Sequence, residues 1–436
     1  MNQFLSLLWR REDAVAKNLL MLGLMVSAFA GVGAGRICIA GSLVFFVVDC
    51  LKGRAKPAMP LVGWLVMGFC AWITLALYWG PSEEVESNQF YKHLFWLNIP
   101  LAFVLIRSTP DRLRMLQLFV LGTGVLGLET LIDSVKAGVA VMQAGGSFRP
   151  DSLIEQVVFH RALGGKDLMG TLVNIGDMQS AQILAAGILV TCGLCIASAG
   201  RSGSRGPWLS LALVVQAVGL FLTFKRGALL ALAVVAVLYL TARFFYRRAK
   251  EPSAGSAMFK ATALWGAVSL VTLFTILPPT DTRQEHLAEA ARKGGRVCMW
   301  MEIAPALIKE YPFGIGYKAL TNDMMRDIAP RVERHRDHMH SNPLQVLVDG
   351  GWPGLALFVL IVVVYFRDGL RALARSDLAR SDRVFTVAMM LAVLMLMLNG
   401  LVEYQLGSGQ INHIYGFLMG MVAAAASGGS TERMHG

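Results

Sequence analysis

The sequence NLLMLGLMVSAFAGVGAG, residues 18–35, contains no charged side chain. A run of this length matches the roughly 20 apolar residues that a helix needs to cross a hydrocarbon core about 30 Å thick. Similar runs recur along the whole chain, and 16% of the residues are charged, whereas soluble proteins carry about 25%. The sequence therefore predicts an all-α, polytopic membrane protein in which this stretch is retained as the first span.

Hydropathy predicts about 12 transmembrane helices in a single integral membrane domain, residues 1–436. We expect them at 18–34, 37–51, 59–79, 93–107, 113–135, 171–198, 206–224, 227–246, 258–278, 346–366, 384–402 and 411–427.

The charges of the short loops support this count. If the N-terminus is cytoplasmic, every second loop should be basic. The loops in question are LKGRAKP, RSTPDRLR, GRSGSRG, RFFYRRAK and FRDGLRALARSDLARSDR, and a loop on the other side is the acidic PSEEVES. Both termini are therefore predicted to be cytoplasmic. Two long loops should lie outside, at 136–170 and at 279–345, and the second, between spans nine and ten, should be partly helical.

The net charge of +11 is explained by these loops and by contact with anionic lipid headgroups, so we expect membrane lipids and no nucleic acid as partners. Two basic sites lie outside this explanation. The first is the tight external turn that contains Lys225 and Arg226. Arginine beside the membrane is a functional candidate because charge there is costly unless it is paired. The alternative is an arginine that reaches to the lipid headgroups.

The second basic site is Arg296, four residues before Trp300 and so on the same face of a helix. A guanidinium group can donate two hydrogen bonds to a phosphate while it stays charged. The alternative is a salt bridge with Glu302 or with a carboxylate of a loop.

A third site is RHRDHMHSNPLQVLVDGGWPG, residues 334–354, where a charged, histidine-rich segment meets the start of an apolar helix. No acidic cluster with ligand spacing accompanies His335, His338 and His340, so we expect no metal. Because imidazole titrates near neutral pH, a base or proton carrier is the favoured role. The basic run Arg331, Arg334, His335 and Arg336 is either a contact to phosphorylated glycan or lipid headgroups or simply solvated charge.

The sequence contains neither a Walker A loop nor a G-x-G-x-x-G loop, and no D-x-D pair in an external loop. An enzyme at the outer face of a bacterial membrane works without ATP or nucleotide sugars. Its donor must already be activated, and a lipid-linked pyrophosphate sugar meets this requirement. Two arginines at the outer surface would bind the pyrophosphate and stabilise the charge of its departure. We expect no cofactor.

Three short motifs in this order resemble the O-antigen ligase family. His340, Ser341, Gly351 and Gly354 are similar to its signature, in which Ser341 replaces the commoner asparagine, and Gln345 follows as in the family's H-N-x-x-L-Q phrase. The turn TFKRGALLAL resembles the family's S-R-G-A-x-L-A-L, with Lys225 where serine is frequent. The segment GRVCMWMEIAPALIKEYPFGIGYKAL, residues 295–320, resembles its R-x-x-x-W … P-x-G-x-G phrase.

The resemblance implies a membrane glycosyltransferase with a GT-C-like fold. It implies transfer of O-antigen from undecaprenyl pyrophosphate to lipid A-core, without metal and with inversion, at the periplasmic face of the inner membrane. His340 matches the catalytic histidine, and Arg226 and Arg296 match the arginines that bind the pyrophosphate. Supporting roles are expected for His338, Lys225, Trp300, Ser341, Asn342, Arg334 and Arg336.

Three alternatives are open. An O-antigen polymerase and a protein O-oligosaccharyltransferase use the same donor, and the short tail SGGSTERMHG, without a pilin-docking domain, favours the ligase. A transporter should show internal repeats and buried ionisable groups. Glu129 and Asp133, one helical turn apart, are the notable internal acidic pair, in either a donor cavity or a simple helix end.

Overall fold

The structure is a computed structural model, and it describes residues 15–29, 32–53, 59–81, 96, 98–143, 177–198, 205–223, 225–250, 296, 299–330 and 338–427. Every regular element within these ranges is helical, which confirms the predicted all-α class. The elements are α2 (Val15–Phe29), α3 (Val32–Leu51), α4 (Leu61–Leu75), η2 (Ala76–Tyr78), α5 (Asn98–Leu105), α6 (Thr109–Gln143), α8 (Asp177–Ser198), α9 (Arg205–Leu222), α10 (Arg226–Lys250), η5 (Met299–Ile303), α14 (Ala304–Glu310), α15 (Asn322–Ile328), α16 (Asn342–Ala374), α17 (Arg380–Gly400) and α18 (Gly409–Ser427).

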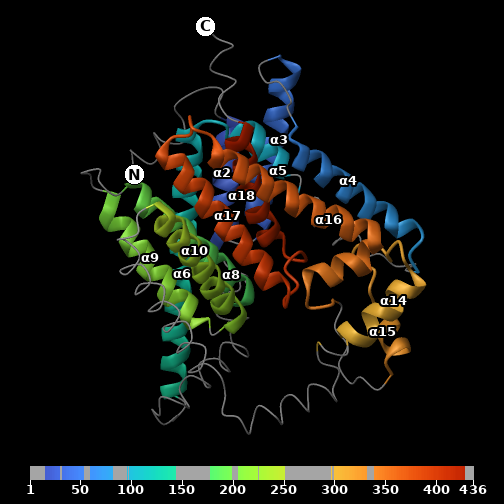
Figure 1. Cartoon of the computed structure of the whole chain (residues 1–436). Coiled ribbons are helices and arrows are strands. Elements are labelled where there is room, and N and C mark those ends of the chain that lie inside the picture. Colours follow the sequence, from blue (N-terminus) through green and yellow to red (C-terminus); the bar gives the residue numbers. More distant parts are fainter. Residues whose placement is uncertain are drawn as a thin grey trace.

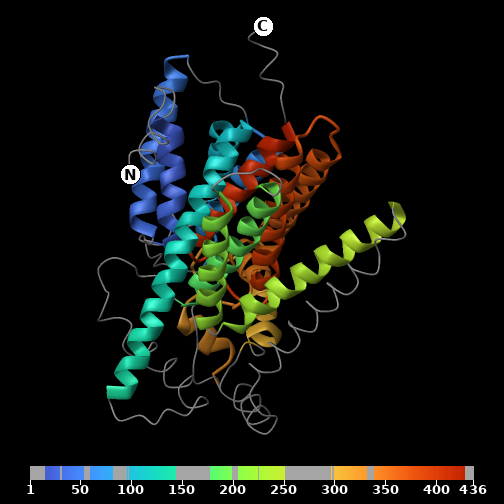
Figure 2. The ribbon, with the colours of Figure 1, turned by 90° about the vertical axis from the view of Figure 1, so that its left-hand side faces the viewer.

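Among the described residues, seven helices are long and apolar enough to cross a membrane. A helix overlaps each predicted span except 258–278, which lies outside the described residues. Helix α6 is longer than expected, because it continues to Gln143 and extends beyond one end of the bundle (Figure 2). Its 35 residues measure about 52 Å, well over the hydrocarbon thickness. The chain is therefore a polytopic membrane protein, as its sequence predicts.

Helix α18 forms the centre of the bundle and is buried at every residue from Gly409 to Ala425. It packs against α2, α5, α16 and α17 (Figure 1). Small residues allow this close contact, since a Cβ atom on Gly420 would lie 2.5 Å from the carbonyl oxygen of Ile99 in α5. Gly416 and Gly420 have the four-residue spacing typical of closely packed membrane helices.

Helix α16 is interrupted at Gly351, which has φ 62° and ψ −162° and is followed by Trp352-Pro353. The interruption frees backbone groups that need partners in apolar surroundings. Residues 312–316, PFGIG, provide three of these partners. Before the break, Ile315 N–H donates to Val348 O (3.0 Å) and Gly316 N–H donates to Asp349 O (2.8 Å). After the break, Pro312 O accepts from Trp352 N–H (3.1 Å). The loop is thus bonded on both sides of the break.

The segment 299–330 has a hydrophobic core of its own, separate from that of the bundle. Met299, Ile303 and Leu307 are among its buried side chains, together with Met325 and with Val348 of α16. This core seats η5, α14 and α15 at one end of α4 and α16 (Figure 1). The predicted loop 279–345 is therefore partly helical where the structure describes it.

Two ion pairs join the N-terminal ends of α2, α6 and α17. Lys17 of α2 lies 2.7 Å from Asp111 of α6, and Arg112 of α6 lies 3.2 Å from Asp382 of α17. The second pair is almost completely buried. Some of the basic residues of the loops predicted to be cytoplasmic therefore hold helices together in addition to any effect on topology.

We predict that Gly351→Ala destabilises the protein strongly. Its positive φ disfavours a side chain, and a Cβ atom would lie 2.2 Å from the carbonyl oxygen of Pro312. The cost should exceed about 1 kcal/mol and appear as a lower melting temperature in detergent. The matched control is Gly68→Ala on α4, where a Cβ atom meets nothing within 4 Å. Equal melting temperatures for the two variants would contradict this account of the break.

Candidate functional site

His340 lies directly before α16 in a conformation that few residues adopt. Its φ is +51°, in the left-handed region, which costs a side-chain-bearing residue about 1–3 kcal/mol and recurs at active sites. The residue is 5% exposed. Ser341, also buried, is the N-cap of α16. Such a conformation persists only where surrounding contacts hold it.

Those contacts include two hydrogen bonds to the backbone of the preceding residue, Met339, one at its amide and one at its carbonyl. The amide of Met339 donates to Gln345 Oε1 at 2.8 Å, and its carbonyl accepts from Trp300 Nε1 at 2.7 Å. Gln345 is itself held, because its amide donates to Asp349 Oδ1 at 2.7 Å. Gln345 and Trp300, which belong to two separate motifs, thus act together to fix the position of His340.

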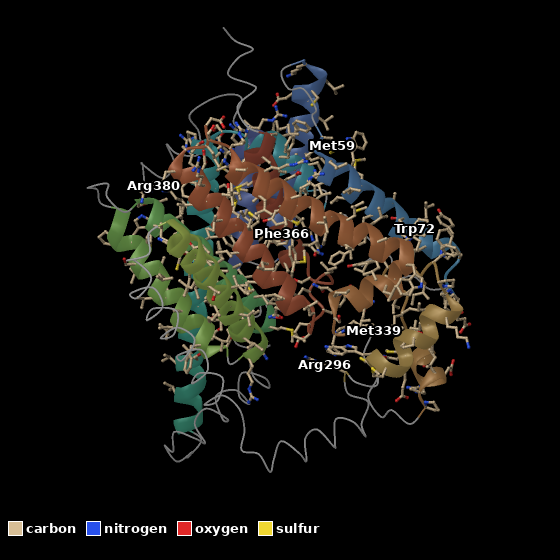
Figure 3. The ribbon with its side chains drawn as sticks, viewed as in Figure 1. Met59, Trp72, Arg296, Met339, Phe366 and Arg380 are labelled. Carbon is tan, nitrogen blue, oxygen red and sulfur yellow. The ribbon has the colours of Figure 1, made fainter. Side chains whose placement is uncertain are left out.

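Glu403, which belongs to none of the three sequence motifs, links two of the predicted site residues. Its carboxylate forms an ion pair with Arg296 Nη2 and lies 3.8 Å from His340 Nδ1. Arg296 Nη1 also donates to Val402 O at 2.8 Å. Figure 3 shows Arg296 and Met339 at the same end of the bundle. The carboxylate of a loop was one of the partners considered for Arg296, and Glu403 fills that role.

The carboxylate of Glu403 is 12% exposed. Burial raises its pKa, but the neighbouring His340 and Arg296 side chains lower it more, so the pKa lies below the ordinary value of 4.5. Glu403 is therefore ionised near neutral pH. Its side chain brings a fixed negative charge to a histidine and an arginine from two other segments.

The loop that carries Glu403, residues 401–408, is attached to the start of α16 through Asn342. Asn342 Oδ1 accepts hydrogen bonds from Gln405 N–H at 2.7 Å and from Leu406 N–H at 3.2 Å. Gly400 packs so closely that a Cβ atom there would lie 2.2 Å from Asn342 Nδ2. Asn342 thus fixes the distance between His340 and the Glu403 loop.

Arg226 begins α10 beside the same turn. A Cβ atom on the next residue, Gly227, would lie 3.6 Å from Asn399 Nδ2, and Glu403 N–H donates to Asn399 O at 3.0 Å. Arg226 is exposed and Lys225 is half-buried. All three predicted principal residues thus belong to segments that meet around the C-terminal end of α17.

The other predicted residues have different outcomes. The ring of His338 lies 4.3 Å from that of His340 and 5.4 Å from that of Tyr404. Glu129 and Asp133 lie on α6, which packs against α2, α8 and α9. The basic run Arg331, Arg334, His335 and Arg336 lies outside the described residues. Their supporting roles stay predictions.

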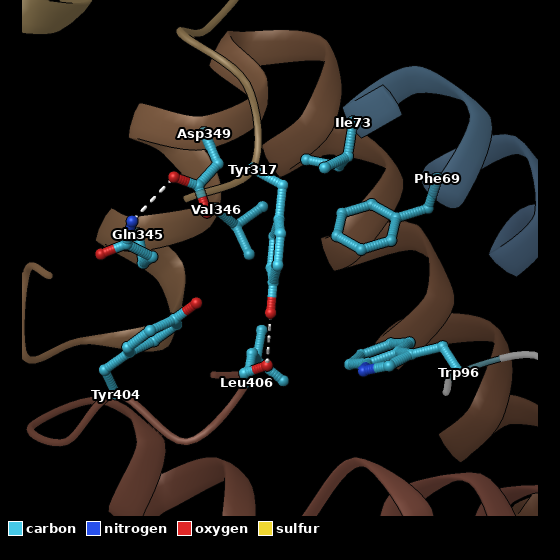
Figure 4. Close-up of a pocket in the computed structure, with 9 residues that line it drawn as sticks. All are labelled: Phe69, Ile73, Trp96, Tyr317, Gln345, Val346, Asp349, Tyr404 and Leu406. Atoms are coloured by element: carbon cyan, nitrogen blue, oxygen red, sulfur yellow. Dashed lines mark hydrogen bonds between the residues drawn. The ribbon is translucent and has the colours of Figure 1, made fainter. Parts of the chain in front are cut away.

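A small cavity of about 20 Å³ lies between the first turns of α16 and the Glu403 loop. Gln345 and Asp349 line it on one side and Tyr404 lines it on another, while Tyr317 OH donates to Leu406 O at 3.4 Å (Figure 4). Phe69, Ile73 and Trp96 also line it, so a space the size of about one water molecule is enclosed mostly by apolar side chains. Among the described residues, no three His, Cys, Asp or Glu side chains are arranged to hold a metal ion.

Exposed aromatic side chains surround the break in α16. Tyr78, Phe313 and Trp352 are exposed, and Trp72 packs 5.4 Å from Trp79 and 6.4 Å from Phe313, ring to ring. Trp72 Nε1 also donates to Gly350 O at 2.7 Å, at the interruption itself. Aromatic belts of this kind are typical of the membrane–water interface. The pattern indicates that this end of the bundle lies at a membrane surface.

A comparison with known families matches one segment of the chain. Residues 211–359 match the O-antigen ligase family. The match confirms the family resemblance and includes the Arg226 turn, the Arg296 segment and the His340 motif. It implies a glycosyltransferase of ligase or polymerase type that acts on polysaccharide and lipid substrates in a multi-pass membrane setting. No curated protein sequence matches the chain.

Glu403 lies outside the segment that matches the ligase family. One sequence signal favoured it, since GLVEYQLGSG follows span eleven and the charge rule places that loop on the same side as the His340 motif. A single glutamate in a short loop is nevertheless ordinary. Its contact with both Arg296 and His340 depends on how α16 and α17 pack.

We predict that Asn342→Ala destabilises the Glu403 loop. The change leaves two buried backbone N–H groups without their acceptor, and an unsatisfied group costs about 1–3 kcal/mol. The melting temperature should fall, and a protease should cut the 401–408 loop faster. Asn322→Ala, at the exposed start of α15, is the control and should change neither. A fall that is equal in both variants would contradict the role of Asn342.

Proposed function

We propose that the protein is an O-antigen ligase that transfers O-antigen from undecaprenyl pyrophosphate to a sugar hydroxyl of lipid A-core. The observation that carries the proposal is the meeting of Arg296 and His340 at one carboxylate, Glu403, within 3.8 Å of the imidazole. The start of α10, with Arg226, packs on the same turn. Arg296, the cation proposed to bind the leaving pyrophosphate, therefore lies beside His340, the base proposed for the acceptor hydroxyl.

The donor end of the site consists of the two arginines. Arg296 is 43% exposed and Arg226 is exposed, so both are accessible to an anionic ligand. The aromatic belt supports a site at the membrane surface, where the pyrophosphate of a lipid-linked donor would lie. Guanidinium groups bind phosphate oxygens bidentately and stabilise the charge that develops as the pyrophosphate leaves.

The acceptor end of the site is His340. In the proposed reaction its imidazole takes the proton of the acceptor hydroxyl as the oxygen attacks the anomeric carbon. The new glycosidic C–O bond forms while the bond from that carbon to the pyrophosphate oxygen breaks. Undecaprenyl pyrophosphate leaves with the bonding electrons, and one displacement inverts the anomeric configuration. We propose that the reaction needs neither metal nor ATP, because the donor carries its own activation.

The topology completes the proposal. We place the protein in the inner membrane with both termini in the cytoplasm and the His340 site facing the periplasm. The alternation of basic loops supports this orientation. A polymerase or a protein O-oligosaccharyltransferase would use the same donor with another acceptor, so the choice of acceptor is the critical test.

We predict that purified protein in detergent, given lipid-linked O-antigen and lipid A-core with EDTA and without ATP, produces a glycan ladder on a gel. His340→Ala should lower the rate by about 10²–10⁴-fold, the range for loss of a general base. His338→Ala, which removes the neighbouring imidazole with a predicted supporting role, should lower the rate less than His340→Ala does.

Elongation of the lipid-linked glycan without transfer to lipid A-core would identify a polymerase instead. Transfer that survives His340→Ala but not His338→Ala would move the catalytic role to the second histidine. Loss of wild-type transfer in EDTA that added Mg²⁺ restores would overturn the metal-independent mechanism.

We predict that Arg226→Gln raises the KM for the lipid-linked donor about 10–100-fold, because a charge-assisted hydrogen bond contributes about 1.5–3 kcal/mol. The KM for lipid A-core should stay unchanged. The matched control is Arg326→Gln on α15, which removes an exposed arginine that pairs with Asp323. Equal effects of both variants would indicate a general loss of positive charge rather than a donor site.

A further inference from the structure

Glu403 is shared between the two halves of the proposed site. It pairs with Arg296, which would bind the donor, and it approaches His340 Nδ1 to 3.8 Å without reaching hydrogen-bonding distance. The carboxylate is largely buried, whereas the guanidinium of Arg296 is 43% exposed. A donor pyrophosphate can therefore reach Arg296 from solvent and compete with Glu403 for it.

This competition favours the phosphate. A pyrophosphate carries more negative charge than a carboxylate and offers more acceptor oxygens for a bidentate contact. Arg296 Nη1 keeps its bond to Val402 O at 2.8 Å, so the guanidinium is tethered while its other nitrogen changes partner. Glu403 would then lose part of its compensating charge, and a buried carboxylate without compensation is costly.

His340 offers the nearest alternative partner. A movement of about 1 Å would bring Glu403 within hydrogen-bonding distance of Nδ1. That contact selects the tautomer with the proton on Nδ1, so that Nε2 is the nitrogen that accepts a proton, and it stabilises the imidazolium that then forms. Among the described residues, the charged or titratable side chains nearby include Tyr404, His338, whose ring lies 4.3 Å from that of His340 at an angle of 54°, and Lys318, which lies 5.2 Å from the ring of Tyr404.

We propose that Glu403 is a positioning residue that couples donor binding to acceptor activation. Without donor it pairs with Arg296. When pyrophosphate takes Arg296, Glu403 closes on His340 and orients its imidazole as a base. The inference rests on the proposed ligase function. The movement of Glu403 would make His340 a fully competent base only after the donor is bound.

The test is the steady-state kinetics of Glu403→Gln in the full-length protein, with lipid-linked O-antigen and lipid A-core. The amide keeps the shape and removes the charge. We expect kcat to fall about 10–100-fold, as for other groups that orient a reactive side chain. The donor KM should stay equal or fall, since Arg296 is released. The acidic limb of the kcat–pH profile should move to lower pH, because an imidazolium without its carboxylate loses its proton more readily.

Asp323→Asn on α15 is the matched control, because it removes an exposed carboxylate from the segment 299–330, and it should change none of these values. Binding of undecaprenyl pyrophosphate alone, measured by thermal shift, should be equal or tighter in Glu403→Gln. An unchanged kcat would overturn the inference. A fall in kcat together with a higher donor KM and weaker binding would also overturn it, since that pattern shows a static ion pair that only holds Arg296 in place.

The two proposals fail in different ways. If wild-type protein transfers glycan and His340→Ala does not, while Glu403→Gln behaves as wild type, the ligase assignment stands and the coupling is wrong. If wild-type protein transfers nothing to lipid A-core, the ligase assignment fails and the coupling fails with it.

Discussion

The break in α16 at Gly351 is the constraint on which the rest of this site depends. An interrupted helix in apolar surroundings must find partners for its freed backbone groups, because lipid offers none. Here the PFGIG loop bonds to the carbonyls of Val348 and Asp349 and to the amide of Trp352. The loop is therefore tied to α16, and the helical segment that contains Trp300 is anchored beside the start of the same helix.

That anchoring brings residues from separate sequence motifs together around His340. Trp300 and Gln345 form hydrogen bonds with the carbonyl and the amide of Met339. These bonds support the strained conformation of His340. Asn342 holds the loop of Glu403 through two backbone amides. The strain at His340 is thus balanced by hydrogen bonds from three neighbouring segments, the arrangement expected where a reactive group must point in one direction.

Much of the architecture was predictable because its causes are local. Apolar runs of about 20 residues identify the spans, and helices overlap them throughout the described part of the chain. Arg226 and Arg296 stood out because basic residues at those positions contradict the charge rule. The helical extension of α6 to Gln143 was missed, since hydropathy marks where a helix leaves the membrane rather than where it ends. Glu403 was missed because its partners lie 107 and 63 positions away in the sequence.

The sequence by itself determined that this protein is an all-α membrane protein and which histidine and arginines are the candidates for its chemistry. Periodicity, hydropathy and motif spacing are properties of neighbouring residues, so they can be read along the chain. The tertiary structure alone decided that Arg296 and His340 share the carboxylate of Glu403 and that Trp300 and Gln345 fix the same residue. These are contacts between helices, and their existence depends on the packing of α16 against α17 and on the loop that closes the break at Gly351.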